Sequence, residues 1–320
     1  MLRLSAGTAR VLGFNKIQME TPPTCGYIML GQGCQGKCAF CAQSSLAENS
    51  EFLSRITWKP GNEQEFLERL VLSYNKNELG RVCLQVIQKE DSFTITRRLL
   101  KKIRKKCPIP ICVSINGIDL KQMKELVDMG ADKIAISFDA ATPLLFEKIK
   151  QKKWDDYWNL YVQACKEIRE HIVIHLILGL GETALQAFNA LKAFYENRTP
   201  VSLFAFTPLK GTPLSGRKPP ELQYYRKLQI AHYFIRENAL NQKDYPLKEI
   251  LALEDNRLAF KVEKEYLLQN IPGSAFQTFG CSSCNRPFYN EKPGQLPYNY
   301  PRRLMEHERI KAIEQAMGEF

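Results

Sequence analysis

Residues 31–43 read Gly-Gln-Gly-Cys-Gln-Gly-Lys-Cys-Ala-Phe-Cys-Ala-Gln and directly follow a short apolar segment, Gly26–Gly31, that we expect to be a strand. Three cysteines in this stretch, Cys34, Cys38 and Cys41, have the spacing Cys-x3-Cys-x2-Cys. Thiolates at this spacing on one tight loop can bind three irons of a [4Fe–4S] cluster and leave the fourth iron open to an outside ligand. We therefore interpret the stretch as an iron–sulfur site whose open iron performs chemistry.

Two other interpretations of the three cysteines are a zinc site that lacks its fourth ligand and thiols that only pack. Zinc knuckles usually combine two cysteine pairs, or one pair with two histidines. The first histidine of this chain is His171, far from the cysteines in sequence. The spacing therefore favours the iron–sulfur interpretation.

Beyond this loop, short β-rich segments alternate with amphipathic helices along most of the chain. The further expected strands are Arg81–Ile87, Pro110–Ile115, Lys133–Phe138, Ile172–Leu178 and Val201–Phe206. The expected helices lie near Asn62–Tyr74, Phe93–Lys106, Asp119–Met129, Trp154–Arg169, Ala184–Tyr195, Glu221–Asn238 and Leu304–Met317. This alternation is typical of parallel strands joined by helical crossovers.

The pattern predicts an α/β fold, a TIM-like (β/α) barrel that is full or nearly full. Weaker strand patterns at Ile250–Leu253 and Ala275–Phe279 would raise the number of barrel strands to eight. We expect one structural domain, with the barrel in residues 1–280 and a C-terminal extension in residues 281–320. In such barrels function gathers at the C-terminal ends of the strands, and the cysteine loop follows the first of them.

The composition bounds the class of protein. A chain of 320 residues with no apolar stretch of about 20 residues and no signal pattern at its start predicts a cytoplasmic protein without a membrane partner. Its ten cysteines without an export signal fit a reducing compartment and bound metal better than disulfides. The net charge of +11 indicates an acidic partner. The basic residues of 97–106 recur at helical spacing between apolar ones, which indicates a solvated helix face rather than a nucleic-acid surface.

A second cysteine motif, Cys281-Ser-Ser-Cys284, follows the last expected strand. We expect it to cover the catalytic face together with the aromatic, proline-rich segment that begins near Pro287, which we predict to be ordered. Two cysteines cannot hold a cluster alone. The remaining cysteines divide into packing candidates and barrel candidates. Cys107 and Cys165 are expected to pack, Cys25 to lie at the face away from the site, and Cys83 and Cys112 to point into the barrel.

Three further motifs follow expected strands. Ile177 lies in Ile-Leu-Gly-Leu-Gly-Glu-Thr, residues 177–183, which matches a dinucleotide fingerprint but lacks the acidic residue that should end the next strand. Ser137 and Asp139 lie two residues apart and hence on one face of a strand, although Asp139 is also placed to cap a helix. Lys210 lies in Lys-Gly-Thr-Pro-Leu, residues 210–214, which by itself is only a turn.

With these motifs and the aromatic Phe40 before the last loop cysteine, the chain resembles the radical S-adenosylmethionine (radical SAM) superfamily, in particular biotin-synthase-related proteins. The resemblance implies that S-adenosylmethionine binds the open iron and is cleaved to a 5′-deoxyadenosyl radical. It also implies cofactor-binding roles for Phe40, Ser137, Asp139, Ile177 and Lys210. No acid–base residue is needed, because the chemistry takes place at the clusters. The Gly-Gly-Glu element usual after the second strand is absent.

The Gly280–Glu291 region and the segments around Cys83 and Phe204 resemble components of the two-protein lipoyl synthase. That resemblance implies a second, auxiliary [4Fe–4S] cluster, for which we choose Cys83, Cys281 and Cys284, with Cys112 in reserve. A biotin-synthase type of second cluster is incomplete, because its third cysteine corresponds to Val173.

The implied reaction is sulfur insertion into an octanoyl or mercapto-octanoyl chain on a lysine of an acidic lipoyl carrier protein, with the auxiliary cluster as sulfur donor. The implied partners are that carrier, an electron donor such as ferredoxin or flavodoxin, and a second radical SAM protein. The alternatives are sulfur insertion into a free small molecule, a methylation, and, from another class, a metal-binding RNA-interaction module.

Overall fold

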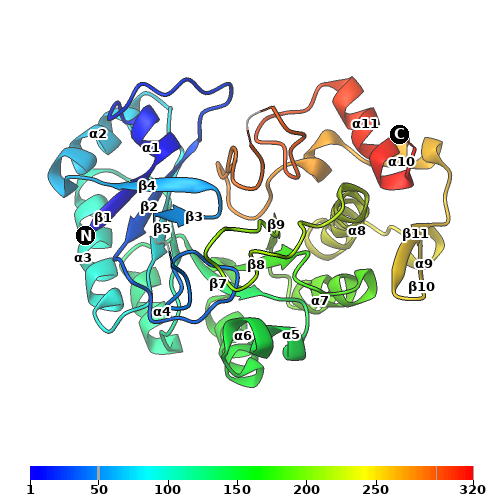
Figure 1. Cartoon of the computed structure of the whole chain (residues 1–320), viewed down its shortest axis with the longest axis horizontal. Helices are drawn as coiled ribbons and strands as arrows, with labels where there is room; N and C mark the ends of the chain where they lie inside the picture. Colours follow the sequence, from blue (N-terminus) through cyan, green and yellow to red (C-terminus); the bar gives the residue numbers. More distant parts are fainter. Residues whose placement is uncertain (49–50, 293, 320) are drawn as a thin grey trace.

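The fold is built on a curved sheet, and the computed structural model describes residues 1–48, 51–292 and 294–319. Within these residues nine strands form one sheet in the order β3-β4-β1-β2-β5-β6-β7-β8-β9 (Figure 1). The strands from β2 to β9 in this order are parallel to their neighbours. They are β2 (Cys25–Leu30), β5 (Arg81–Val86), β6 (Ile111–Ser114), β7 (Lys133–Asp139), β8 (Ile172–Leu178) and β9 (Val201–Ala205). The predicted α/β barrel strands are confirmed.

Three further strands, which the sequence did not predict, extend the sheet beyond β2. They are β1 (Leu2–Ser5), β3 (Phe52–Leu53) and β4 (Ile56–Pro60), with the short helix α1 (Ala6–Val11) after β1. β1 pairs antiparallel with both β2 and β4. A local antiparallel hairpin such as β3–β4 carries little hydrophobic periodicity, because only Trp58 of β4 is buried.

Helices cover the outer face of the parallel strands. They are α2 (Glu63–Asn75), α3 (Ser92–Lys106), α4 (Leu120–Asp128), α5 (Pro143–Lys150), α6 (Trp154–Ile168), α7 (Ala184–Glu196) and α8 (Leu222–Asn241). Successive side chains of each strand point alternately toward these helices and into the barrel. On β2, Ile28 and Leu30 pack toward the helices, whereas Tyr27 and Met29 belong to a separate inner cluster.

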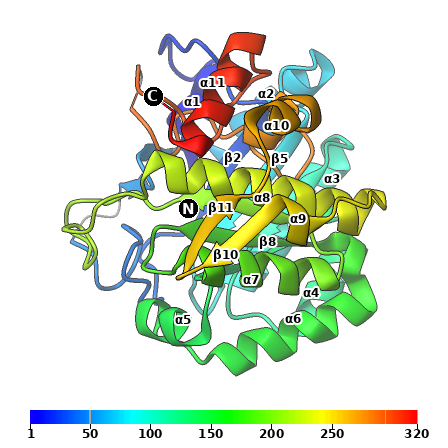
Figure 2. The ribbon, with the colours of Figure 1, turned by 90° about the vertical axis from the view of Figure 1, so that its right-hand side faces the viewer.

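The barrel is partial rather than full. The expected seventh and eighth strands do not join the sheet: β10 (Leu251–Glu254) pairs only with β11 (Arg257–Phe260) in a separate hairpin that lies outside α7 and α8 (Figure 2). Residues Gly273–Phe276 form a 3-10 helix. The weak strand pattern at residues 275–279 was misleading because Ala275 and Phe276 are buried in that turn of helix.

A C-terminal strap, residues 277–292, closes the open side of the sheet. In Figure 1 it lies between the β3–β4 hairpin and β9. It bonds to both edges: Ser54 after β3 donates to the Tyr289 carbonyl (2.5 Å), and Asn290 donates to the Ala205 carbonyl of β9 (2.6 Å). The expectation that this segment is ordered is confirmed.

The end of the chain is fastened to the barrel by α8. Arg226 on this helix is 0% exposed and donates to the carbonyls of Pro297 and Tyr298 (2.6 Å each) and to Gln315 on α11 (3.1 Å). The helices α9 (Leu247–Ile250), α10 (Lys264–Asn270) and α11 (Glu306–Met317) complete the fold.

The basic face of α3 is solvated, as predicted. Leu99, Leu100 and Ile103 are buried, while Arg98 and Lys102 form exposed ion pairs with Glu63 of α2. Among the described residues, none of the helices is both long and apolar enough to cross a membrane.

Candidate functional site: two cysteine groups in one barrel

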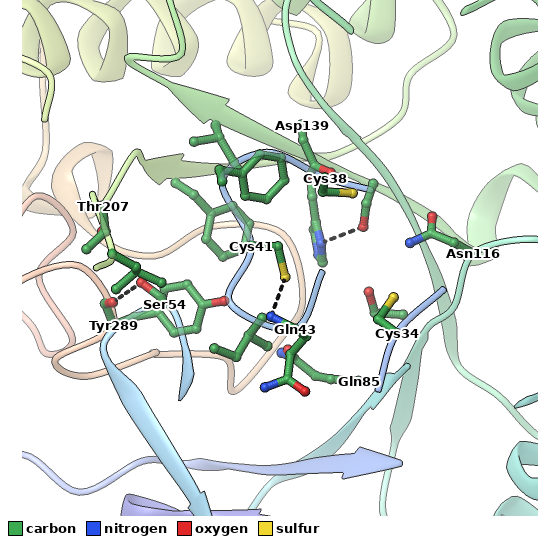
Figure 3. A pocket seen from close by; sticks show the side chains of 18 of the residues that line it. Cys34, Cys38, Cys41, Gln43, Ser54, Gln85, Asn116, Asp139, Thr207 and Tyr289 are labelled. Carbon is green, nitrogen blue, oxygen red and sulfur yellow. Dashed lines mark hydrogen bonds between the residues drawn. The ribbon is translucent and has the colours of Figure 1, made fainter. Parts of the chain in front are cut away.

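The loop cysteines, Cys34, Cys38 and Cys41, lie at the C-terminal end of β2, as predicted. Gly31 and Gly33 allow the loop to turn there because both adopt positive φ (92° and 70°), a conformation that favours glycine. All three thiols are half-buried and line one pocket of about 180 Å³ (Figure 3). The loop is therefore folded around a cavity, with its sulfurs on the cavity wall.

Backbone N–H groups support two of the loop sulfurs. The Gly36 amide donates to Cys34 Sγ (3.2 Å), and the Gln43 amide donates to Cys41 Sγ (3.4 Å). Burial raises the pKa of Cys38 and raises that of Cys41 to about 12. Without a metal these thiols stay protonated at neutral pH, and a bound cation would be needed to stabilise them as thiolates.

Four of the five predicted cofactor-binding residues reach the pocket. Phe40, Ser137, Asp139 and Ile177 line it. Lys210 is exposed in the turn after β9 and is not among the lining residues, so its contact with S-adenosylmethionine stays a prediction. That turn nevertheless packs on the cysteine loop, because Glu48 donates through its amide to the Gly211 carbonyl (3.0 Å).

Asp139 ends β7 in the left-handed region (φ 63°) and is held there by a buried ion pair. Lys150, on α5, lies 2.6 Å from Asp139 Oδ2 and also donates to the Ser137 carbonyl. Burial opposes the Lys150 charge, but the Asp139 carboxylate outweighs it, so the pKa of Lys150 is raised. The ion pair fixes the carboxylate at the pocket wall, and the helix-capping alternative for Asp139 is wrong because Thr142 caps α5.

Next to Asp139, His175 on β8 lines the pocket and was not singled out from the sequence. Burial lowers its pKa to about 3, and the nearby charges of Arg286 and Lys150 add to this shift. The imidazole is therefore neutral, and its Nδ1 lies 3.5 Å from Ser137 Oγ. The signal in the sequence was its period-two position between Val173 and Ile177, which places it on the inner face of the strand.

The glycine motif after β8 is not arranged for a dinucleotide. Glu182 accepts hydrogen bonds from the amides of Gly179 (2.6 Å) and Leu180 (3.0 Å) and from the Tyr224 hydroxyl (2.7 Å). Amides that a pyrophosphate would need are thus occupied by a carboxylate of the chain itself. The rejection of the fingerprint rests on this contact as well as on the missing acidic residue.

The structure gathers a second set of thiols that we call the inner cysteine group. Its members are Cys25, Cys83, Cys112, Cys281 and Cys284. The first three lie in the N-terminal halves of β2, β5 and β6 and point into the barrel. The predicted trio of Cys83, Cys281 and Cys284 and the reserve Cys112 therefore lie together, and Cys25 joins them.

One prediction about this group was wrong, the placement of the second motif, whereas the prediction for Cys25 is confirmed. The motif Cys281–Cys284 does not cover the catalytic face but lies at the opposite mouth, where Arg81, the first residue of β5, donates to the Ser282 carbonyl (2.7 Å). Thr24, which precedes β2, donates through its hydroxyl to the Ser283 carbonyl (2.9 Å). Cys25 does lie away from the loop cysteines, but this is the end of the barrel where the second motif sits.

Close packing fixes the position of the second motif. A Cβ on Gly280 would lie 1.9 Å from Ser202 Oγ, and one on Gly80 would lie 2.5 Å from Ser283 Oγ. Gly280 also has a φ of 129°, which other residues rarely adopt. Only glycine at both positions lets the motif reach the strand ends.

The thiols of the inner cysteine group interact with one another. The Cys25 thiol, by hydrogen bonding, lowers the pKa of Cys284 to about 6, although burial opposes this. The Cys112 thiol likewise lowers the pKa of Cys281. Tyr27 Oη also lies within hydrogen-bonding distance of Cys284 Sγ (3.5 Å).

The donor chemistry of both groups fits iron–sulfur clusters. Within the described ranges, no group of three or more His, Cys, Asp or Glu side chains is arranged to hold one metal ion. The thiols of a cluster, however, each bind a different iron, and both groups offer only sulfur. Arg81 and Arg286 lie near Cys281 and Cys284 and supply positive charge for bound thiolates. Cys107 and Cys165 pack against the hydrophobic core, as predicted.

Tyr289 of the strap lies between the two cysteine groups and was missed from the sequence. Its hydroxyl points into the pocket beside Gln43 and Cys41 (Figure 3), and its ring is also within electrostatic range of Cys83. Asn290 beside it bonds Thr207 (3.0 Å). The positions of Tyr289 and Asn290 depend on contacts between the strap and strands far away in the sequence. The local sequence therefore indicated only that the segment is rich in aromatic residues and ordered.

Comparisons with known proteins agree with this arrangement. The profile of the radical SAM superfamily matches residues 28–192. Biotin synthase of Persephonella marina is 23% identical over 205 residues, which are 63% of this chain and 59% of that protein. Biotin synthase of Methanococcus aeolicus is 24% identical over 182 residues, 56% of this chain and 54% of that protein. The matched part thus spans less than two thirds of these curated relatives.

Solved structures show the same fold at low identity. Methylornithine synthase (PylB) superposes with a TM-score of 0.52 at 17% identity, covering 67% of this chain and 68% of the other. The FeFe-hydrogenase maturase HydG from Carboxydothermus hydrogenoformans gives 0.52 at 16% identity, covering 66% and 51%. Because the family profile covers more than half of the chain and contains all three loop cysteines, this chain belongs to the radical SAM superfamily, whose members use a [4Fe–4S] cluster and S-adenosylmethionine.

Proposed function

We propose that this protein inserts sulfur into C–H bonds of an octanoyl or mercapto-octanoyl chain carried on a lysine of a lipoyl carrier protein. The observation that carries the proposal is the presence of two separate cysteine groups at opposite ends of one barrel, with Tyr289 between them. When bound, the clusters would supply the electron that cleaves S-adenosylmethionine and the sulfide that the substrate carbon takes up.

The chain's own residues would then bind, orient and exclude water. Cys34, Cys38 and Cys41 would hold the first cluster, leaving its fourth iron facing the pocket for S-adenosylmethionine. Asp139, which pairs with Lys150, would accept hydrogen bonds from the ribose hydroxyls, and Ile177 would pack on the adenine. Apolar and aromatic groups such as Phe204 and Tyr289 line the remaining wall and would keep water from a carbon radical.

The second cluster is proposed to bind the inner cysteine group. The three ligands chosen from the sequence are Cys83, Cys281 and Cys284. Two further thiols, those of Cys112 and Cys25, lie within reach of them. A four-iron cluster with no open iron needs four protein ligands, so this group could supply a complete set. A cluster in this place would face the pocket across Tyr289, which suits it to give sulfur to a chain between the two groups.

Three partners belong to the proposal. The acidic carrier is supported by the net charge of +11. An electron donor such as ferredoxin or flavodoxin is required because cleavage of S-adenosylmethionine consumes an electron. A second radical SAM protein would carry out the other of two sulfur insertions.

The experiment that tests the function is anaerobic turnover of an octanoylated carrier peptide with S-adenosylmethionine and a reductant, followed by mass spectrometry. We expect a peptide that has gained one sulfur and the formation of 5′-deoxyadenosine. A parallel reaction with the mercapto-octanoyl peptide assigns the step. Formation of 5′-deoxyadenosine with no sulfur in either peptide would contradict the proposal.

A second candidate is sulfur insertion into a free small molecule, favoured by the similarity to biotin synthases. Turnover of dethiobiotin under the same conditions, with no reaction of the carrier peptide, would establish this candidate instead.

A further inference from the structure

Arg3 on β1 contacts both ends of the cysteine loop, and none of the functions assigned so far involves it. Leu2 and Leu4 on the same strand pack in the main hydrophobic core, so the side chain of Arg3 points to the opposite face, toward the barrel interior. It is only 4% exposed. The pairing of β1 with β2 places Arg3 opposite Met29, two residues before Gly31, where the loop starts.

At the start of the loop, residues 1–3 bind both peptide groups of Gly31. The Gly31 amide donates to the Met1 carbonyl (2.9 Å), and the Gly31 carbonyl accepts a hydrogen bond from Arg3 Nη2 (3.0 Å). Gly31 adopts a positive φ (92°), and glycine can adopt other conformations at little cost, so contacts on both sides are needed to keep it there. Arg3 thereby helps to fix the direction in which the chain leaves β2 toward Cys34.

At the end of the loop, Arg3 acts through Gln43. Arg3 Nη2 donates to Gln43 Oε1 (2.8 Å), and Gln43 Nε2 donates to the Phe52 carbonyl (2.8 Å). Gln43 is 2% exposed, so its side chain is held on both sides. Its backbone amide donates to Cys41 Sγ (3.4 Å) (Figure 3). The orientation of this N–H···S hydrogen bond therefore depends on the contact between Gln43 and Arg3.

The cost of burying Arg3 indicates a role beyond packing. A buried guanidinium loses its hydration, and burial accordingly lowers the pKa of Arg3. An apolar side chain, like those of Leu2 and Leu4 beside it, would fill the space without that cost. Its third acceptor, Met29 Sδ (2.8 Å), lines the same pocket as Gln43. All the acceptors printed on this guanidinium thus belong to the cysteine loop or to the strand residue that leads into it.

Hydrogen bonds to the sulfurs of an iron–sulfur cluster are among the features that set its reduction potential. Residues that hold metal ligands in place without binding the metal typically change metal affinity or activity by about 10–100-fold when they are replaced. A side chain that fixes both ends of a ligand loop and the donor to one ligand sulfur has the contacts that such a residue needs.

We propose that Arg3 is a positioning residue for the loop cluster. By binding Gly31 and Gln43 at once, it holds the cysteine loop in its cluster-binding conformation and keeps the Gln43 amide directed at Cys41. The inference concerns the cleavage of S-adenosylmethionine that the superfamily shares, so it depends neither on the substrate nor on the inner cysteine group. It gives β1, which lies outside the matched residues 28–192, a part in the active site.

The reduction potential of the loop cluster in the reconstituted full chain tests the proposal. The loop cluster is the one whose electron paramagnetic resonance signal changes when S-adenosylmethionine is added, because its fourth iron is open. In Arg3→Met we expect a shift to a more negative potential, because a weaker N–H···S hydrogen bond stabilises the reduced cluster less. Iron release from this cluster to a chelator should become at least about tenfold faster.

Arg104→Met is the matched control. It removes a half-buried arginine that likewise donates to two backbone elements, the carbonyls of Gly130 (3.0 Å) and Ile109 (2.6 Å), but lies on α3 away from the pocket. This variant should change neither the potential nor the rate of iron release, even if it lowers the stability of the fold.

Two further variants test the contact where Arg3→Met is too unstable to reconstitute. Arg3→Lys keeps the charge and a donor and should give an intermediate potential. Gln43→Leu keeps the backbone amide but removes the acceptor for Arg3, and should shift the potential in the same direction as Arg3→Met. Combined with Arg3→Met it should add less than the sum of the two single shifts, because both changes act on the same hydrogen bond. An unchanged potential in Arg3→Met and Gln43→Leu, fully additive shifts, or an equal shift in Arg104→Met would overturn the inference.

Discussion

The two cysteine groups differ in how the chain builds them. The loop cysteines come from eight consecutive residues after β2 and lie half-buried at the C-terminal ends of the strands. The inner cysteine group combines three strands with the strap, so its members span residues 25 to 284. The first site is therefore set by local sequence, and the second exists only when the barrel has closed. The two sites should respond differently to the same kind of substitution.

The largest effect is expected at the loop cysteines. Replacing Cys38 with alanine leaves two thiols for a cluster that needs three, so 5′-deoxyadenosine formation should fall to background, a loss of at least about a thousandfold. The measurement is chromatography of 5′-deoxyadenosine after anaerobic incubation with reductant. The matched control, Cys165→Ala on α6, removes a packing thiol and should retain activity. Retained cleavage in Cys38→Ala would show that the loop site is misassigned.

A different loss is expected at the inner cysteine group. Cys281→Ala and Cys284→Ala should abolish sulfur gain by the octanoyl peptide while 5′-deoxyadenosine formation stays within about threefold of the parent protein, because the loop site is built independently. Liquid chromatography with mass detection measures both products in one reaction. If both products disappear together, the groups are not independent and the comparison fails.

Cys25→Ala tests whether Cys25 is a cluster ligand, as proposed for the other thiols of the inner cysteine group. Because five thiols surround a site that needs four, we expect sulfur gain to fall less than in Cys284→Ala, with a changed electron paramagnetic resonance signal if Cys25 is one of the ligands. An unchanged signal together with full sulfur gain would make Cys25 a packing residue, like Cys107.

A smaller effect, on stability, is expected from the ion pair behind the loop site. Lys150→Met leaves the Asp139 carboxylate buried without its partner and should lower the free energy of unfolding by about 3–5 kcal/mol. Since the pKa of Lys150 is raised, its contribution is complete below its usual pKa of about 10.4 and is lost as the pH rises through the folded value. Urea unfolding from pH 7 to pH 11 should show constant stabilisation by the pair up to about pH 10 and the onset of its loss above that. Lys150→Met/Asp139→Asn should recover most of the loss; no recovery would contradict the account.

The parallel strands, their crossover helices and the loop cysteines were predictable because each depends on local periodicity or spacing. Ser137 and Asp139, two residues apart on one strand, were found for the same reason. The antiparallel β1, β3 and β4 were not found, since short edge strands carry a weak pattern. The extent of the barrel was overestimated, because an apolar stretch such as residues 275–279 suits a buried turn of helix as well as a strand.

The inner cysteine group shows more clearly what could not be predicted from the sequence. Sequence placed Cys83 and Cys112 on the inner face of their strands, but not the end of the barrel at which Cys281 and Cys284 would meet them. That depends on the path of the strap, which the contacts of Arg81 and Thr24 fix over more than 200 positions in sequence. Tyr289 and Arg286 were missed for the same reason.

Iron and sulfide counting after anaerobic reconstitution tests the central claim most directly. Two cysteine groups that each hold a four-iron cluster predict about eight irons and eight sulfides per chain. The double variant Cys281→Ala/Cys284→Ala, which leaves only three of the five inner thiols, should then retain about four of each, while Cys165→Ala should retain about eight. About four irons in the parent chain, or equal iron contents in the double variant and Cys165→Ala, would contradict the account.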